Sequence, residues 1–344
     1  MADVKIAIDC MGGDNAPFEV VKGALEALKA DRDIYIYLVG RESEIKKVIA
    51  ELMSDDDKIK TDNLEIIDAS EIIENAEHPV KAVRTKKDSS MVRGLQLLKE
   101  NEADAFLSAG NTGALLVGGQ TIAGRMKGVE RACLAPVMPT PRGPVVLVDA
   151  GANMDARPAW LLQWAKMGSV YSSKMFDKTS PKVALVNVGE EEEKGNKLVQ
   201  ETFPLLREDG SLNFTGSIEA RDISAGEADV IVCDAFVGNV ILKMYEGVAK
   251  TLLSEIKRAI YSSSMSKIGG ALIKKSLKGV LSTYNAASYG GAVLLGTKGL
   301  VVKAHGNSEA EQIVIAIRQI AGLLRKNILG DMAGLFDNAV DVPS

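Results

Sequence analysis

The chain has 344 residues, of which 46% are hydrophobic, 25% charged and 5% aromatic. This length and composition predict a large folded core and exclude a disordered chain or a small disulfide-stapled domain. The net charge of −5 argues against a nucleic-acid-binding protein. The cysteines lie far apart without a CxxC pair, and the chain shows no secretory signal and no apolar run of about 20 residues. We therefore expect a cytoplasmic protein with reduced thiols.

Predicted strands and helices alternate along the first half of the chain. The strands cover residues 4–8, 34–39, 64–68, 103–107, 134–137 and 145–148, and the helices cover residues 18–28, 43–53 and 158–176. Ser43 is predicted to cap the second helix. The proline- and glycine-rich linker 138–144 predicts a hairpin between the last two strands, so we expect a mixed sheet.

The same alternation continues in the second half. The strands cover residues 182–186, 212–216, 230–234, 292–295 and 300–302, and a helix covers residues 198–206. Gly238 or Asn239 is predicted to open a long helix that runs to about residue 260, and Ser308 with Glu311 to cap a final helix that runs to about residue 326. This order predicts an α/β fold with a largely parallel sheet covered on both faces. No domain boundary is firm, so we treat residues 1–344 as a single domain.

Several predicted strands end in small, polar, glycine-containing turns. These turns cover residues 9–15, 108–113, 149–153, 189–196 and 234–239. In a parallel sheet such turns lie along one edge. Helix starts at that edge offer unpaired backbone N–H groups, and glycine lets an anion approach the backbone closely. The set of turns therefore predicts an anion site, with phosphate as a suitable ligand.

The turn after residue 186 carries one lysine, Lys194, directly after four consecutive glutamates. Charge pattern alone predicts a solvated loop here. The glutamates also suggest a magnesium site, but contiguous side chains cannot all face one ion. No spacing of histidine, cysteine or carboxylate residues supports a metal site, and we expect neither metal nor cofactor.

The usual catalytic signatures are missing from the sequence. There is no phosphate-binding P-loop, no nucleophile elbow and no dinucleotide-binding fingerprint. His305 is open to two interpretations, a general base or a hydrogen-bonded structural histidine, and His78 is predicted to be exposed and inert. A reaction without a covalent nucleophile fits better, in which a bound anion attacks an activated carbonyl group.

A stretch from residue 257 to residue 308 contains no acidic residue. Its positive charges are Lys257, Arg258, Lys267, Lys274, Lys275, Lys278, Lys298 and Lys303. Residues 257–281 are predicted to form a basic amphipathic helical segment that Gly269 and Gly270 loosen. This segment is either a core-facing helix with a solvated basic face or a contact for an anionic membrane or an acidic carrier protein. RNA binding fits less well because aromatic residues are scarce.

Eight motifs occur in an order that resembles one bacterial family. They are residues 9–14 (DCMGGD), 84–90 (RTKKDSS), 108–114 (SAGNTGA), 149–153 (DAGAN), 193–196 (EKGN), 238–243 (GNVILK), 289–292 (YGGA) and 304–308 (AHGNS). Each motif alone is nonspecific. Together, from residue 5 to beyond residue 320, they resemble the phosphate acyltransferases of phospholipid synthesis, the PlsX family.

The resemblance implies a fold, an activity and a set of partners. The fold is a three-layer α/β/α sandwich with a largely parallel mixed sheet, similar to phosphotransacetylase and to isocitrate and isopropylmalate dehydrogenases. The implied reaction transfers a fatty acyl group from acyl-carrier protein to inorganic phosphate, and the acyl phosphate passes to a membrane glycerol-3-phosphate acyltransferase. The resemblance also implies a homodimer in the cytoplasm that contacts an anionic membrane peripherally. Nucleic acid is not an expected partner.

The resemblance also implies which residues form the site. Lys194 and Asn239 match positions linked to catalysis in the family. The phosphate-binding set that we extend from these motifs is Asn111, Thr112, Asn153, Gly238 and His305. Three other functions stay open: a short-chain phosphotransacetylase that uses acyl-CoA, a related dehydrogenase, and a non-enzymatic scaffold that binds the carrier. The dehydrogenase would need a cluster of arginines and aspartates, which the sequence lacks.

Overall fold

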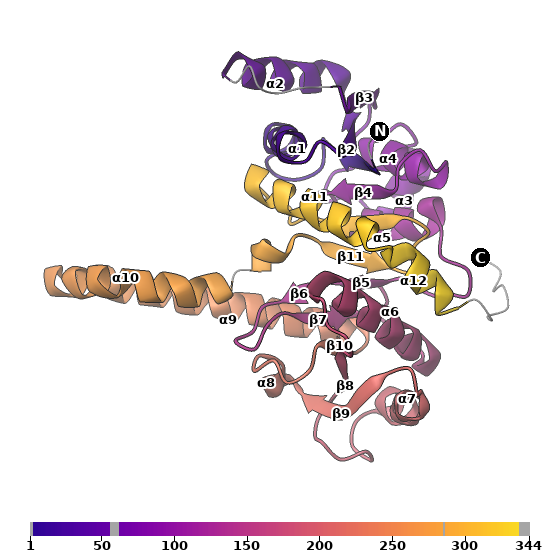
Figure 1. The fold of residues 1–344 in the computed structure, drawn as a ribbon, viewed down its shortest axis with the longest axis vertical. Helices are drawn as coiled ribbons and strands as arrows, with labels where there is room; N and C mark the ends of the chain where they lie inside the picture. The colour runs from indigo at the N-terminus through magenta and orange to yellow at the C-terminus, as the bar shows by residue number, and fades with distance from the viewer. Residues whose placement is uncertain (1–2, 56–61, 285, 337–344) are drawn as a thin grey trace.

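The computed structural model describes residues 3–55, 62–284 and 286–336. Strands and helices alternate along it, and Figure 1 shows helices on both sides of the strands. The predicted domain of residues 1–344 also includes residues 1–2, 56–61, 285 and 337–344, which lie outside the described residues.

The strands form two sheets. The seven-stranded sheet has the order β3 (Leu64–Asp68), β2 (Ile34–Gly40), β1 (Val4–Asp9), β4 (Ala105–Ser108), β12 (Leu300–Lys303), β11 (Ala292–Leu295) and β5 (Cys133–Ala135). The five-stranded sheet has the order β6 (Val137–Met138), β7 (Val145–Val148), β10 (Val230–Val232), β8 (Lys182–Asn187) and β9 (Asn213–Glu219). Neighbouring strands are parallel except where β11 meets β12 and β5, and where β6 meets β7. The predicted mixed and largely parallel arrangement is confirmed.

Helices connect the strands in chain order. They are α1 (Phe18–Ala30), α2 (Glu42–Asp55), α3 (Pro79–Thr85), α4 (Ser90–Lys99), α5 (Thr112–Gly118), α6 (Pro158–Phe176), α7 (Lys197–Glu208), α8 (Ala220–Ile223), α9 (Ala235–Tyr261), α10 (Ser264–Thr283), α11 (Ala310–Arg325) and α12 (Ile328–Gly334), with short helices η1 (Gly119–Ala123) and η2 (Ala286–Tyr289). In Figure 1, α1 and α11 lie on one side of the seven-stranded sheet, and α3, α4 and α5 lie on the other.

Alternate residues of the strands fill separate cores. Ile8 of β1 belongs to the same buried cluster as Leu25 of α1 and Ile317 of α11. Its neighbour Ala7 belongs to a second cluster, with Leu95 of α4. This alternation follows from the two-residue period of a strand, and it explains why continuous apolar runs form strands covered on both faces. The first cluster also contains Leu185 of β8, so one core extends over both sheets.

The predicted hairpin between residues 134–137 and 145–148 is only partly correct. The first of these segments divides at Pro136: β5 joins the seven-stranded sheet, and only β6 pairs with β7. Proline has no N–H group to continue a ladder, which accounts for the break. The chain therefore passes from one sheet to the other through Pro136.

Three predicted helix starts are wrong by one to four residues. The second helix begins at Glu42, so Ser43 lies inside it. The long helix α9 begins at Ala235 because the Asp234 carboxylate accepts a hydrogen bond from the N–H of Val237 at 3.0 Å. The last predicted cap also shifts by one residue, because Glu309 and Gln312 form the capping box in place of Ser308 and Glu311.

Helices α9 and α10 form an antiparallel pair, and α10 extends away from the sheets (Figure 1). The turn between them lies at residues 262–263, whereas Gly269 and Gly270 lie inside α10. A Cβ atom at Gly270 would lie 2.4 Å from Cγ2 of Ile260, so this glycine allows close packing of the two helices rather than loosening one. Among the described helices, none is long and apolar enough to span a membrane.

Candidate functional site

Three glycine-containing turns meet at the carboxyl ends of β1, β4 and β12. A Cβ atom at Gly12 would lie 2.7 Å from the backbone nitrogen of Gly110, and one at Gly13 would lie 3.0 Å from the carbonyl oxygen of Gly306. The N–H of Asp14 donates to that same carbonyl oxygen at 2.7 Å. The predicted gathering is only partly correct: the turns at residues 9–15 and 108–113 meet here with the turn at residues 304–308, whereas the other three predicted turns follow strands of the five-stranded sheet.

Asp9 is the buried carboxylate at this edge. The hydroxyl group of Ser108 donates to its Oδ2 atom at 2.7 Å, and the N–H of Met11 donates to its Oδ1 atom at 3.2 Å. Burial raises the pKa of Asp9, and these hydrogen bonds partly offset that rise. Asp9 therefore ties β1 to β4 beneath the turns.

Asn111 is buried, and its side chain bonds to the protein itself. Its Oδ1 atom accepts a hydrogen bond from the N–H of Ala114 at 2.9 Å and caps α5. Its Nδ2 atom donates to the carbonyl oxygens of Glu74, Asn75 and Glu77 at 3.1–3.2 Å. These bonds occupy the oxygen and the amide hydrogens of the side chain, so Asn111 positions the turn after β4.

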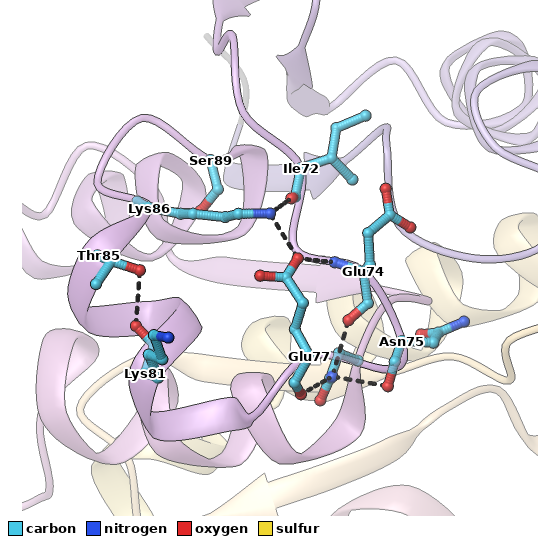
Figure 2. Close-up of polar contacts among 9 residues, drawn as sticks. Ile72, Glu74, Asn75, Glu77, Lys81, Thr85, Lys86 and Ser89 are labelled. Carbon is cyan, nitrogen blue, oxygen red and sulfur yellow. Dashed lines mark hydrogen bonds and ion pairs between the residues drawn. The ribbon is translucent and has the colours of Figure 1, made fainter.

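The loop that Asn111 holds is itself fastened by an ion pair. Figure 2 shows the Lys86 ammonium between the carbonyl oxygen of Ile72, at 2.6 Å, and the Glu77 carboxylate, at 2.5 Å. The Lys86 hydrogen bond holds the pKa of Glu77 below its usual range. The N–H of Glu74 also donates to this carboxylate at 2.8 Å. The motif at residues 84–90 thus supports the turn that begins α5.

A second group of predicted residues lies where α9 meets the end of β7. The buried Asp149 carboxylate accepts hydrogen bonds from the N–H and the side-chain amide of Asn153, at 2.9 and 2.8 Å. The carbonyl oxygen of Asn153 accepts a bond from the N–H of Ala235. A Cβ atom at Gly238 would lie 1.9 Å from the carbonyl oxygen of Asp149. Only glycine lets the first turn of α9 lie directly on this backbone.

Asn239 is a partly buried residue near the start of α9. It lies one turn before Lys243, so both side chains share a face of the helix. Burial is the main cause that lowers the pKa of Lys303, the last residue of β12, and the positive charge of Lys243 lowers that pKa further, so the two ammonium groups lie within electrostatic reach. Among the described residues, no hydrogen bond joins the Asn239 side chain to the turns that carry Ser108 and His305.

Lys194 lies apart from that edge. Its ammonium group forms an ion pair with Glu191 at 2.6 Å, about half of its side chain is exposed, and Glu191 raises its pKa. Its other charged neighbours are Glu193 and Glu219 at the end of β9. In the described part of the chain, no contact joins Lys194 to Asn239 or Asn111.

The two remaining predicted residues are exposed. Thr112 is the first residue of α5, and His305 lies in the turn after β12, where its Nδ1 atom accepts a bond from the N–H of Asn307 at 3.5 Å. Among residues 3–55, 62–284 and 286–336, no group of three His, Cys, Asp or Glu side chains is placed to hold a metal ion.

Lys303 is the residue at this edge that sequence patterns did not single out. Its ammonium group donates to the carbonyl oxygens of Ala109, at 3.0 Å, and Ala304. In the sequence, Lys303 is one of eight basic residues between residues 257 and 308 and does not stand out from the others. Its place directly before the AHGNS motif, at the end of a strand, was the available signal.

The fold and this site define a class: an α/β protein whose parallel strands end at a glycine-lined edge that carries Lys303 beside Asp9 and Asp14. The model of a family described as fatty acid synthesis protein matches residues 4–330. The chain is 47% identical over 330 residues to the phosphate acyltransferase of Clostridium perfringens, with 96% of each chain covered. The chain therefore belongs to this family of phosphate acyltransferases.

Solved structures show the same fold at lower sequence identity. A phosphotransacetylase from Streptococcus pyogenes aligns with a TM-score of 0.62 and 18% identity over 94% of each chain. A 4-hydroxythreonine-4-phosphate dehydrogenase from Klebsiella pneumoniae aligns with a TM-score of 0.52 and 13% identity over 93% of this chain and 99% of that one. The predicted fold class, phosphotransacetylase-like and dehydrogenase-like, is confirmed.

Proposed function

We propose that the protein transfers a fatty acyl group from acyl-carrier protein to inorganic phosphate and releases acyl phosphate for phospholipid synthesis. The observation that carries this proposal is the glycine-lined edge with Lys303 at the ends of β1, β4 and β12, in a chain whose relatives are named phosphate acyltransferase. A phosphate oxygen attacks the thioester carbonyl carbon, the carbon–sulfur bond breaks, and the carrier leaves as a thiolate that takes up a proton. Such a reaction needs an oriented anion and donors for the developing oxyanion.

In this proposal the predicted residues have separate roles. Asn239 lies on the face of α9 that Lys243 shares, and its amide donates to phosphate or to the thioester oxyanion. Lys194 neutralises charge from the edge of the second sheet, once substrate replaces Glu191 as its partner. Thr112 and His305 contact the bound substrate from exposed turns. Asn111 shapes the phosphate-binding edge, and Asn153 and Gly238 position the start of α9 that carries Asn239; the bonds and close contacts of these residues with the protein support these roles.

Thioester cleavage with two donors tests the proposed reaction. We expect phosphate-dependent release of carrier thiol from a long-chain acyl-carrier protein, and much slower cleavage of short-chain acyl-CoA. Cleavage of acyl-CoA alone would favour a phosphotransacetylase, the name that the Streptococcus pyogenes structure carries. Carrier binding without any phosphate-dependent cleavage would favour a non-enzymatic scaffold.

We also propose that the helical pair α9 and α10 forms the contact with an anionic membrane surface. Exposed apolar residues run along both helices: Phe236, Val240, Met244, Val248, Leu252, Met265, Ile268, Leu272 and Ile273. Leu272 is 81% exposed and Met265 77% exposed, and Lys267, Lys274, Lys275 and Lys278 add positive charge nearby. Apolar and basic residues on one exposed helix are typical of interfacial binding. The apolar side of α9 is also available to a second copy of the chain, in line with the expected homodimer.

Vesicle binding tests this contact. We expect charge reversal at Lys274, Lys275 and Lys278 to weaken binding to vesicles that contain anionic lipid by about a hundredfold or more at low salt, because each basic residue near such a surface contributes about 1 kcal/mol. The matched control reverses three exposed lysines elsewhere, Lys47, Lys81 and Lys298, and changes net charge equally. Equal binding by both variants would refute the membrane contact, and weaker binding to acyl-carrier protein instead would assign the helices to the carrier.

A further inference from the structure

Lys303 occupies an unusual position for a lysine. It is the last residue of β12, in register with Ser108 of β4, and so it lies at the carboxyl edge of the central parallel strands. It is partly buried, and burial lowers the pKa of its ammonium group to about 8. A lysine that serves only as a solvated surface charge would not be expected in such a partly buried position.

The contacts of Lys303 leave its charge unneutralised. Two of its three N–H donors are taken by the carbonyl oxygens of Ala109 and Ala304. No carboxylate among the described residues lies within ion-pair distance of its nitrogen. Asp9 and Asp14 attract it from farther away and raise its pKa, and Lys243 of α9 repels it. Lys303 is thus a cation with two neutral carbonyl partners and a second cation near it. A bound anion would accept its third N–H and neutralise its charge.

Glycine turns lie directly beside the Lys303 ammonium. Cβ atoms at Gly13 and Gly306 would lie 3.6 and 4.0 Å from the carbonyl oxygen of Ala109, which accepts the Lys303 hydrogen bond. The Asp14 carboxylate also lies near, 3.6 Å from a Cβ atom at Gly306. An ammonium group with a remaining donor, beside backbone that carries no side chain, is suited to a phosphate ion.

We propose that Lys303 binds the acceptor phosphate at the carboxyl edge of β12, and that the positive charge of Lys243, which pairs with Glu246 on α9, assists it. This inference rests on the proposed function, because it names where the attacking phosphate lies. Lys303 fixes the phosphate at the edge of the first sheet, and the thioester carbonyl approaches from the side of Asn239. Neither lysine forms a covalent bond. Lys303 is thereby added to the phosphate-binding residues, and Lys194 acts on the acyl-carrier side.

Steady-state kinetics with phosphate as the varied substrate tests the site. We expect Lys303→Met to raise the KM for phosphate roughly tenfold or more, since a charge-assisted hydrogen bond contributes about 1.5–3 kcal/mol, with the KM for acyl-carrier protein unchanged. Lys243→Met, at an exposed side chain, should raise it about threefold. Lys298→Met, an exposed lysine at the opposite end of β12, is the matched control and should leave it unchanged.

The pH profile separates binding from a structural role. In the wild-type protein, kcat/KM for phosphate should fall as pH rises through about 8, because the Lys303 ammonium loses its proton there. The charged groups that face it are Asp9, Asp14 and Lys243, and His305 lies in the next turn. Lys303→Arg keeps its charge above that pH, so it should retain a phosphate KM near the wild-type value and lose the alkaline fall. An unchanged phosphate KM in Lys303→Met, or the same alkaline fall in Lys303→Arg, would overturn the proposal.

A binding measurement with inorganic phosphate, without any acyl donor, tests the phosphate site separately from the proposed acyl transfer. We expect the wild-type protein to bind phosphate in a calorimetric titration and Lys303→Met not to bind it, with equal melting temperatures showing that both are folded. If the wild-type protein bound phosphate in this way but cleaved no thioester, the proposed function would fail and the site would stand. Equal phosphate binding by both folded proteins would refute the site.

Discussion

Two strand-end lysines, Lys303 and Lys194, show how differently the two sheets present charge. Lys303 is partly buried among turns that pack on one another, and burial lowers its pKa to about 8. Lys194 lies in an exposed loop, and Glu191 in that loop raises its pKa. The first arrangement fixes a cation in one position, whereas the second leaves it free to change partner. A fixed charge suits the binding of a small anion, and a movable charge suits a substrate that arrives on a carrier protein.

The largest loss of stability and activity is expected where the first turn of α9 lies on the backbone at the end of β7, between the regions of Lys303 and Lys194. In Gly238→Ala, the added Cβ atom would lie 1.9 Å from the carbonyl oxygen of Asp149, so α9 must shift away from the backbone that it contacts. We expect a loss of about 3 kcal/mol in the free energy of unfolding and little remaining activity. Urea denaturation measures the first and thiol release the second. Gly247→Ala, in the same helix with no atom within 4 Å, should be neutral or stabilising by up to about 1 kcal/mol. Similar losses in both variants would contradict the close approach.

Lys194→Ala is expected to separate activity from stability. It should lower kcat roughly hundredfold, as the loss of one preorganised donor does, while the phosphate KM stays near the wild-type value. Its free energy of unfolding should change by less than about 1 kcal/mol, because its ion pair is exposed. Near-normal formation of acyl phosphate by this variant would remove Lys194 from the mechanism.

Asn111→Ala is expected to act through the fold of the first region. The variant loses the cap of α5 and leaves the carbonyl oxygens of Glu74, Asn75 and Glu77 without this donor. We expect a decrease of about 2 kcal/mol in the free energy of unfolding, measured in urea. Thr112→Ala, its exposed neighbour, should change that energy by no more than about 0.5 kcal/mol. Equal stability of the two variants would show that the Asn111 bonds contribute little.

The smallest effect is expected in the loop of Lys194. In Glu191→Gln the carboxylate that raises the pKa of Lys194 is gone, so that pKa should fall toward its ordinary value. The change in stability should stay below about 1 kcal/mol, because the pair is exposed and screened by salt. Titration of the Lys194 ammonium by NMR measures the shift. An unchanged pKa would mean that Glu191 is not its partner in solution.

The sequence predicts much of the fold because buried segments have a clear period. The strands at residues 64–68 and 145–148 and the helix at residues 158–176 match the structure residue for residue. Helix starts are harder to predict, since several neighbouring polar residues can cap and tertiary contacts select one. For this reason the sequence predicts Gly238 or Asn239 at the start of α9, which Asp234 caps. It likewise predicts Ser308 as the cap of α11, which Glu309 caps.

The site is less predictable than the fold. Asn111 and Asn153 lie in the expected turns, but only the folded chain shows that their side chains bond to the protein. The burial of Lys303 depends on the carbonyl oxygen of Ala109, almost two hundred residues away. The sequence places this lysine only in the basic stretch from residue 257 to residue 308, because charge patterns along a sequence do not show which cation is removed from solvent.

The most direct test of the reaction is the product itself. The wild-type protein is incubated with a long-chain acyl-carrier protein and inorganic phosphate, and phosphorus NMR follows the mixture while released thiol is counted. We expect a new acyl phosphate signal and one thiol for each acyl phosphate, with no thiol release when phosphate is left out. Thiol release that gives free fatty acid without acyl phosphate would show a hydrolase and contradict the proposed function.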